Sequence, residues 1–276
     1  MTPLTLTLKS VPSVRVDLSP LTPDRLSGLT LSAIRQIKLD VGRQQVAVSE
    51  IFKVSGRDAS HMEFHRASNR LMNIGAQMTL GEINVKGSVG DYLGRGMRGG
   101  TIRVRGDAGA LAGNGMSGGL IEIHGSAGDG LGAANAGDAH GMGGGTIIVM
   151  GNAGERVANR MRRGIIIIKG NAGDYCGARM LAGTVLVLGN TGQFAGMGMQ
   201  RGTIILGRRP KHLSTTFNSC GTLKMQFLRI MFRHLTRAHR SLAMLKDQGP
   251  LCDRYCGDLS TGGHGELMVL RGAYSY

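Results

Sequence analysis

GEINVKGSVGDYLGRGMRG at residues 81–99 is followed directly by GTIRVRGDAGALAGNGMSG at residues 100–118, and the same pattern returns until residue 206. The opening glycines of the copies are Gly81, Gly100, Gly119, Gly145, Gly164 and Gly183, with Gly202 beginning a partial copy. The interval between opening glycines is constant at nineteen positions, except that the third copy is seven residues longer. A fixed period of this size predicts a solenoid, in which each unit buries its apolar face only against its neighbours.

Each copy begins with apolar residues at every second position, which predicts a short strand with alternate side chains facing inward. The two inward columns are Ile83, Ile102, Ile121, Ile147, Ile166, Val185 and Ile204, and then Val85, Val104, Ile123, Val149, Ile168, Val187 and Leu206. A third column consists of Met97, Met116, Met142, Met161, Met180 and Met199. Because methionine fills irregular gaps between packed elements, this column is interpreted as core rather than as a metal or redox site.

These patterns predict an all-β fold, a right-handed parallel β-helix of about seven coils of 19 residues, roughly 34 Å long at the usual strand spacing. The right hand is favoured because left-handed hexapeptide helices have coils with three equal sides, whereas these units are one residue longer and have unequal sides. We expect an N-terminal β cap at residues 1–61, the parallel β-helix at 62–209, and a C-terminal helix and tail at 210–276.

Outside the copies, four alternating apolar stretches predict strands at residues 4–8, 37–40, 45–48 and 51–54. Residues 62–80 keep Gly75 and Met78 in register with the copies and are expected to form a degenerate first coil. Residues 222–246 show helical apolar periodicity with arginines between, which predicts an amphipathic helix with a basic face. This helix is expected to pack across the last coils as a cap, with nucleic-acid or membrane contact as the alternative.

The formal net charge of +15 indicates an acidic partner, which can be nucleic acid, an anionic membrane, an acidic protein surface or a polyanionic small molecule. The sequence shows no signal peptide and no apolar run long enough to span a membrane. Cys176, Cys220, Cys252 and Cys256 follow no disulfide framework, so a reducing cytoplasm is expected. Cys252 and Cys256 with His264 nearby are a poor zinc motif, and no metal site or catalytic residue is predicted.

Arginines gather within three residues of the methionine column. They are Arg95, Arg98, Arg160, Arg162, Arg163, Arg179 and Arg201. Stacked coils would place them on a common edge, either as a track for a polyanion or as a solvated rim paired with an acidic column. That column contains Asp91, Asp129, Glu155 and Asp174. Carboxylates on adjacent coils also suit a retaining glycosidase. However, each follows a corner glycine, where Asp is common for turn reasons, and aromatic residues are few.

The outward column of the strands is polar in the first copies and apolar in the later ones. The apolar residues are Ile148, Ile167, Leu186 and Ile205, with Met150 and Leu188 two residues after the first and third of them. A strip of this kind is too apolar to face water, so either the C-terminal segment or another chain must cover it. We predict that it is a partner interface.

Several stretches are distinctive in their sequence: GNAGDYCGARMLAGT, MRRG, GMGGGTIIVMGNAG, the FKVSG entry at residues 52–56 and the closing GDLSTGGHGE. Together they resemble the C subunit of formylmethanofuran dehydrogenase. The same GXGXG repeat forms the C-terminal domain of the glutamate synthase large subunit. The outer segments are more similar to the bacterial version, the formyltransferase/hydrolase complex. Two departures from the pattern are Ala158, where most copies have Gly, and His264, where Lys is expected.

The resemblance implies a heteromeric complex of A, B, C and D subunits in one-carbon metabolism. In the bacterial version a formyl group passes from tetrahydromethanopterin to methylofuran on the D subunit and is hydrolysed to formate at the metal site of the A subunit. The C subunit carries no known catalytic residue and is expected to bind no cofactor, while methylofuran, tetrahydromethanopterin and zinc belong to the complex. The arginines would guide the polyglutamate tail of methylofuran, since a planar guanidinium binds carboxylates bidentately.

Two further functions stay open from the sequence. One is a β-helical spacer in a glutamate synthase-like amidotransferase, which would have a glutaminase or flavin partner. The other is nucleic-acid binding, which the basic charge permits and the scarcity of aromatic residues disfavours. The sequence therefore favours a noncatalytic scaffold with no nucleic-acid or membrane partner.

Overall fold

A computed structural model describes residues 2–246 and 248–272 of the chain. The strands are β1 (Pro3–Leu8), β2 (Val16–Asp17), β3 (Lys38–Val41), β4 (Gln44–Ala47), β5 (Phe52–Ser55), β6 (Asp58–Ala67), β7 (Leu71–Met72), β8 (Glu82–Gly87), β9 (Thr101–Val104), β10 (Leu120–Ile123), β11 (Gly143–Val149), β12 (Arg163–Ile168), β13 (Thr184–Val187), β14 (Arg201–Leu206), β15 (Asn218–Lys224), β16 (Leu251–Gly257) and β17 (His264–Leu270). The helices are α1 (Pro23–Leu26), α2 (Leu31–Gln36), α3 (Val48–Ile51) and α4 (Gln226–Ala238), with 3₁₀ turns η1 (Arg240–Leu245) and η2 (Leu259–Thr261). The structure is thus rich in β-strands, as expected.

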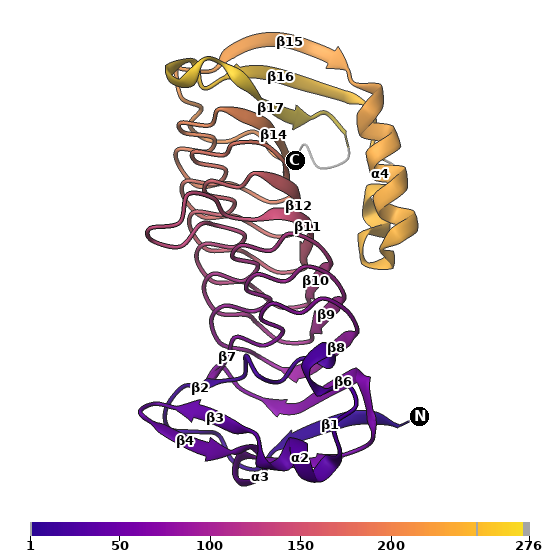
Figure 1. Cartoon of the computed structure of the whole chain (residues 1–276). Helices are drawn as coiled ribbons and strands as arrows, with labels where there is room; N and C mark the ends of the chain where they lie inside the picture. Colours follow the sequence, from indigo (N-terminus) through magenta and orange to yellow (C-terminus); the bar gives the residue numbers. More distant parts are fainter. Residues whose placement is uncertain (1, 247, 273–276) are drawn as a thin grey trace.

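The repeats form a stack of coils with parallel strands one above another (Figure 1). One long sheet has the order β15-β16-β17-β14-β13-β12-β11-β10-β9-β8-β6-β1-β5. From β8 to β14 every neighbouring pair is parallel, and the inward residues face their counterparts one copy away, as in Ile83↔Ile102 and Val85↔Val104. A second line of parallel bridges runs through Val89, Ala108, Ala127, Ala153, Ala172 and Thr191. The predicted register of the copies is confirmed.

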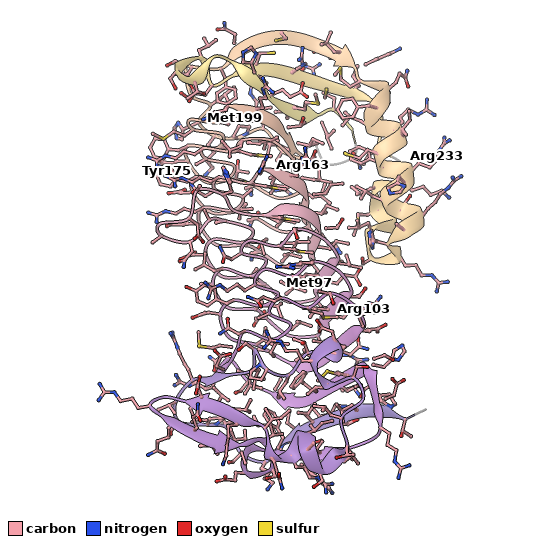
Figure 2. The ribbon with its side chains drawn as sticks, in the orientation of Figure 1. Met97, Arg103, Arg163, Tyr175, Met199 and Arg233 are labelled. Carbon is pink, nitrogen blue, oxygen red and sulfur yellow. The ribbon has the colours of Figure 1, made fainter. Side chains whose placement is uncertain are left out.

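The three predicted inward columns form the core of the stack. All of their side chains are buried, and the methionines at the far end of each coil are fully so. Figure 2 labels the methionines Met97 and Met199 near the two ends of the stack. The interpretation of the methionine column as core is confirmed.

The opening glycines are required because successive coils approach closely there. Gly119 has φ +88°, and a Cβ atom on it would lie 2.7 Å from the carbonyl oxygen of Gly100 and 2.7 Å from the Met97 methyl carbon. No side chain fits between these atoms, and an L-residue seldom adopts this φ. Each coil therefore needs glycine at this corner.

A column of short polar side chains joins the coils at another corner. The Ser126 amide donates to Asp107 Oδ1 at 2.7 Å, the Asn171 amide to Asn152 Oδ1 at 2.8 Å, and the Asn190 amide to Asn171 Oδ1 at 2.8 Å. These bonds satisfy backbone groups that the short strands leave unpaired. Asn, Asp and Ser recur here because their side chains reach a neighbouring main chain.

The N-terminal segment closes one end of the stack. β6 pairs in parallel with β8, with Met62 opposite Ile83, so the degenerate first coil is confirmed. β1 pairs with β6 and β5 pairs with β1, which covers the sheet edge that β6 would otherwise expose. The predicted strands are found within one residue of the expected bounds, except that Val48 already begins α3.

The C-terminal segment closes the other end. β17 pairs in parallel with β14, and the antiparallel strands β16 and β15 extend the sheet beyond it. The helix predicted at 222–246 is shorter than expected, because Thr222, Leu223 and Lys224 belong to β15 and pair with β16. α4 then runs back alongside the stack (Figure 1). Among the described residues, no helix is long and apolar enough to cross a membrane.

Replacing Gly119 by alanine is expected to destabilise the stack by about 2–4 kcal/mol, because strain at positive φ adds to the clash with the Gly100 carbonyl. The matched control is Gly137→Ala, since Gly137 has φ +89° but nothing within 4 Å of the added Cβ. Urea unfolding of the two variants separates backbone strain from the clash. Equal losses in both variants would show that the close approach of the coils contributes nothing.

Candidate functional site: an arginine groove across the later coils

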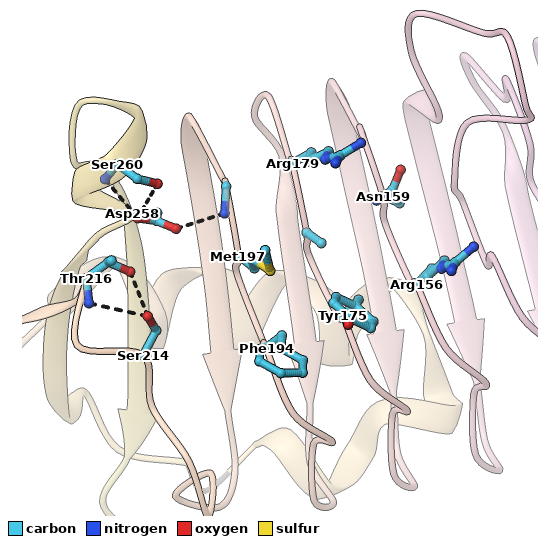
Figure 3. A pocket seen from close by; sticks show the side chains of 12 residues that line it. Arg156, Asn159, Tyr175, Arg179, Phe194, Met197, Ser214, Thr216, Asp258 and Ser260 are labelled. Carbon is cyan, nitrogen blue, oxygen red and sulfur yellow. Dashed lines mark hydrogen bonds between the residues drawn. The ribbon is translucent and has the colours of Figure 1, made fainter.

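Two adjoining cavities lie along the loop side of the later coils, with volumes of about 660 and 430 Å³. Both are lined by Arg156, Asn159 and Arg179, and we call the two together the arginine groove. The larger cavity adds Tyr175, Phe194, Met197, Ser214, Thr216 and Asp258 (Figure 3). The smaller one adds Arg160 and part of the seven-residue insertion, including Asn135 and Gly137. The groove thus crosses several coils and ends at the C-terminal cap.

An aromatic platform forms one part of the groove. Arg156, Tyr175 and Phe194 occupy the same position of three successive copies. The Tyr175 and Phe194 rings are stacked, with centroids 5.0 Å apart and planes inclined by 19°. Phe194 is 45% exposed and Met197 is 49% exposed. An exposed ring stack beside two guanidinium groups suits a ligand with planar or apolar parts and negative charge.

Groove arginines stand in backbone conformations that favour glycine. Arg156, Arg160 and Arg179 have φ of 58°, 55° and 53°. At the position of Arg160 and Arg179, other copies have Gly96, Gly115 and Gly198, with φ from 63° to 68°. A left-handed conformation costs an L-residue about 1–2 kcal/mol. Because other copies have glycine at the position of Arg160 and Arg179, these two side chains point to a function rather than to stability. The position of Arg156 is left-handed in the other copies too, including Leu111 and Tyr175, so its conformation belongs to the repeat.

Ala158 departs from the expected glycine in the same coil. It is buried and has φ of 57°, while Gly177 at the same position of the next copy has φ 70°. The coil from residue 145 to 163 therefore has three left-handed non-glycine residues, at Arg156, Ala158 and Arg160. A methyl group is accommodated in the core where most copies have none.

The seven predicted arginines occupy four positions of the repeat, so only Arg160 and Arg179 meet in the groove. Arg95 lines a separate cavity of about 400 Å³ near the N-terminal cap and lies 5.3 Å from the centre of the Tyr92 ring. Arg98 and Arg162 each follow a core methionine and are exposed, whereas Arg163 and Arg201 begin β12 and β14. The predicted common edge is therefore only partial.

Arg156 is a groove residue that the sequence pattern did not predict. It lies five residues before Met161, outside the three-residue window used to select arginines. Its sequence signal was its place one repeat before Tyr175, in a column whose other members are Tyr92, Leu111, Gly130 and Phe194. Whether a side chain lines the groove depends on its position within the coil. Sequence distance from a core methionine does not determine that position.

Ion pairs with the acidic column do not neutralise these arginines. Within residues 2–246 and 248–272, none of the seven predicted arginines, nor Arg156, forms a salt bridge. Asp129 and Asp174 instead accept the amides of Glu155 and Gln193 in the following coils, at 2.8 and 2.7 Å. This turn role also explains the acidic column without glycosidase chemistry. Asp129 and Asp258 also line the groove, but Arg156, Arg160 and Arg179 outnumber them, so the formal charge of the lining is positive and favours an anion.

The closing GDLSTGGHGE stretch forms one wall of the groove. Asp258 is buried, and its Oδ2 accepts the Gly198 amide at 2.9 Å while its Oδ1 accepts the Ser260 amide and hydroxyl at 2.9 and 2.8 Å. Burial by itself raises the pKa of Asp258, but the donors of Gly198 and Ser260 outweigh it, so the pKa lies below the ordinary value. Asp258 therefore stays ionised and fixes the cap to the last coil.

The groove offers guanidinium, aromatic, amide and hydroxyl groups, which bind and orient an anion. In the part of the chain that the structure describes, no three His, Cys, Asp or Glu side chains are placed to hold a metal ion. The CxxxC residues Cys252 and Cys256 lie on β16, where Cys252 is buried in an apolar cluster and burial raises its pKa. The geometry is that of a binding surface.

The apolar strip is covered by the chain's own C-terminal segment, so the prediction of a partner interface there is wrong. Ile148, Ile167, Leu186, Leu188 and Ile205 are buried. They pack in one cluster with Leu228, Phe232 and Leu235 of α4, with Leu242 and Leu245 of η1, and with Met268 of β17, and Met150 is partly buried against the same cluster. The strip was expected to be covered either by the C-terminal segment or by another chain, and the structure shows the C-terminal segment covering it. Its amphipathic face supplies the apolar surface that the strip requires.

Two comparisons with known proteins cover most of the chain. The GXGXG motif family model matches residues 35–232. The X-ray structure of the formyltransferase/hydrolase complex FhcABCD from Methylorubrum extorquens, in complex with methylofuran, contains a chain with a TM-score of 0.89 and 37% identity. The match covers 97% of this chain and 100% of that one.

Curated relatives match over a shorter region. The C subunit of the tungsten-containing formylmethanofuran dehydrogenase 2 from Methanococcus maripaludis is 36% identical over 96 residues, which is 34% of this chain and 35% of the relative. The C subunit of the formyltransferase/hydrolase complex from Methylorubrum extorquens is 39% identical over 89 residues, 32% of this chain and 34% of the relative. The matched region thus spans about a third of these relatives.

The fold and the repeat place the chain among the GXGXG proteins. It belongs, within them, to the family of the C subunits of formylmethanofuran dehydrogenase and of the formyltransferase/hydrolase complex.

Replacing Phe232 by alanine is expected to lower stability by about 3–5 kcal/mol, because the ring is buried against the strip and its loss leaves a cavity. The control is Ile230→Ala on the same helix, where the side chain is 71% exposed and the change should stay within about 0.5 kcal/mol. Urea unfolding measures both. A negligible effect of Phe232→Ala would mean that α4 does not hold the strip in solution.

Proposed function

We propose that this chain is the noncatalytic C subunit of a formyltransferase/hydrolase complex and assembles with the A, B and D subunits. The partners would transfer a formyl group from tetrahydromethanopterin to methylofuran and hydrolyse it to formate, with zinc on one of the partners. The full-length similarity to a chain of the FhcABCD complex supports this role. So does a site whose lining supplies guanidinium, aromatic and hydroxyl groups that can hold an anion.

We propose further that the arginine groove guides the polyglutamate tail of methylofuran. The observation that carries this proposal is the presence of Arg160 and Arg179 in left-handed conformations where other copies have glycine. Their guanidinium groups line one groove with Arg156 and have no salt bridge to a described carboxylate. A run of carboxylates separated by flexible linkers matches cations spaced along successive coils. Arg95, Arg98, Arg162, Arg163 and Arg201 would add a wider positive field.

The stack is inferred to be a right-handed parallel β-helix, with the caps at residues 1–61 and 210–276 as separate units. Supports are the parallel pairing between copies and the second line of bridges at the opposite corner. Because its own helix covers the apolar strip, the partner surfaces must be sought elsewhere on the chain. A cytoplasmic location accords with four cysteines that are free thiols.

Co-purification of the tagged native protein tests the assembly role. We expect a formyltransferase, an amidohydrolase-like chain and bound methylofuran to be recovered with it and identified by mass spectrometry. Since the groove supplies binding groups only, activity should appear in the assembled fraction and not with this chain by itself. Recovery of the chain alone, or with a glutaminase or a flavoprotein, would contradict the proposal and favour a glutamate synthase-like spacer.

The groove is tested by replacing Arg156, Arg160 and Arg179 together with glutamine. We expect an increase of about 10-fold or more in the KM for methylofuran at low salt, with assembly unchanged, because three charge-assisted contacts are lost. The difference should shrink as salt screens the groove. Measurements use the purified complex, with its composition checked by gel electrophoresis.

A matched control removes the same charge elsewhere. Arg105, Lys169 and Arg208 are exposed and lie outside the groove, so their joint replacement by glutamine should leave the KM within about 2-fold. A similar increase in KM in both variants would mean that the effect comes from net charge alone. If the KM for methylofuran increased in neither variant, the groove would have no role in methylofuran binding.

A further inference from the structure

Two cysteines face each other at the C-terminal cap. Cys220 lies on β15 and Cys256 on the neighbouring antiparallel strand β16, with their sulfur atoms 3.2 Å apart. Both are free thiols, and the Cys220 S–H is placed to donate to Cys256. Sulfurs this close on adjacent strands can be joined with little movement of the backbone.

The surroundings of this pair differ from those of the other two cysteines. Cys220 is exposed and Cys256 half-buried, whereas Cys176 and Cys252 are fully buried. Burial raises the pKa of Cys176 to about 12, so that thiol is inert as a nucleophile. Packing explains Cys176 and Cys252 but gives no reason for a thiol at Cys220.

The local backbone allows the sulfurs to adjust. The register of β15 against β16 shifts between Ser219 and Thr222, so Cys220 lies in a bulge. Gly221 follows at φ +75°, with nothing within 4 Å of where a Cβ would stand. All seven residues of β15 are exposed, and a small-molecule oxidant can therefore reach Cys220.

A cation stands beside the pair. Burial raises the pKa of Cys256 and the Cys220 thiol adds to this, while the Arg254 guanidinium acts in the opposite direction by favouring the thiolate. Arg254 is held in place by Glu266, with Nε 2.9 Å from the carboxylate oxygen. The exposed Cys220 is thus the entry point, and Cys256 beside Arg254 is the resolving thiol.

We propose that Cys220 and Cys256 form an oxidative modification site, a dithiol that small-molecule disulfides convert into an intrachain disulfide. In the first step the Cys220 thiolate attacks one sulfur of oxidised glutathione, which forms a mixed disulfide and releases one glutathione thiolate. The Cys256 thiolate then attacks Cys220 Sγ, forms the Cys220–Cys256 bond and releases the second glutathione. Two protein thiol protons are given up, and one glutathione disulfide is reduced to two glutathiones.

The bond would fix the outermost strand of the cap. Among the described strands, β15 pairs with β16 alone, and the Thr222 hydroxyl adds a hydrogen bond by donating to Asp253 at 2.6 Å. The same strand leads through Met225 into α4, which covers the apolar strip. Oxidation therefore reinforces the attachment of α4 to the stack, and reduction releases that restraint.

The test incubates the full-length protein with oxidised glutathione and locates disulfides by peptide mass spectrometry without reduction. We expect a Cys220–Cys256 crosslink with the loss of two hydrogen atoms, reversed by a dithiol reductant. Hydrogen exchange of β15 amides should slow at least several-fold in the oxidised protein, since opening of the strand is restrained.

Two variants complete the test. Cys220→Ser should abolish both the crosslink and the slower exchange, whereas Cys252→Ser, a change at a buried thiol on the same strand as Cys256, should retain them. The proposal is overturned by a stable mixed disulfide at Cys220 without the crosslink, by crosslinks between chains only, or by exchange that oxidation leaves unchanged.

Discussion

Close contact between the backbones of successive coils is the constraint on which the rest of this structure depends. The carbonyl of Gly100 accepts the Leu120 amide at 3.0 Å, and the carbonyl of Gly119 accepts the Thr146 amide at 3.0 Å, so hydrogen bonds join one copy to the next. Glycine is needed at these corners because a Cβ would meet the preceding carbonyl and the methionine methyl group. Because the corners are fixed, the strands of successive coils are aligned. Equivalent apolar residues of neighbouring copies are therefore buried against each other.

The same alignment makes the surface of the stack a set of columns. A position that is structurally neutral in one coil can be varied in the next without disturbing the core, since each coil contacts only its neighbours. The arginine groove uses this freedom at Arg156, Arg160 and Arg179, where other copies have glycine, leucine or an aromatic residue. Backbone strain at these left-handed positions is tolerated because the surrounding coils hold them in place.

The caps solve the problem of open sheet edges in two ways. At the N-terminal end β1 and β5 extend the sheet, while at the C-terminal end β17, β16 and β15 extend it and α4 turns back along its outer face (Figure 1). Figure 2 shows Arg233 on the far side of α4 and Tyr175 on the opposite, loop side of the stack. The basic helix and the groove are thus separate surfaces of one chain.

The sequence by itself determined the repeat, the strand register and the core, because the period of two within a copy and the constant spacing between copies leave one way to stack the ladders. It also located Arg160 and Arg179 but missed Arg156. Only the tertiary structure decided which arginines share a groove and that α4, rather than another chain, covers Ile148 and Ile167. Both features depend on contacts between segments that are far apart in the chain. The local periodicity of the sequence does not predict how close such segments come in space.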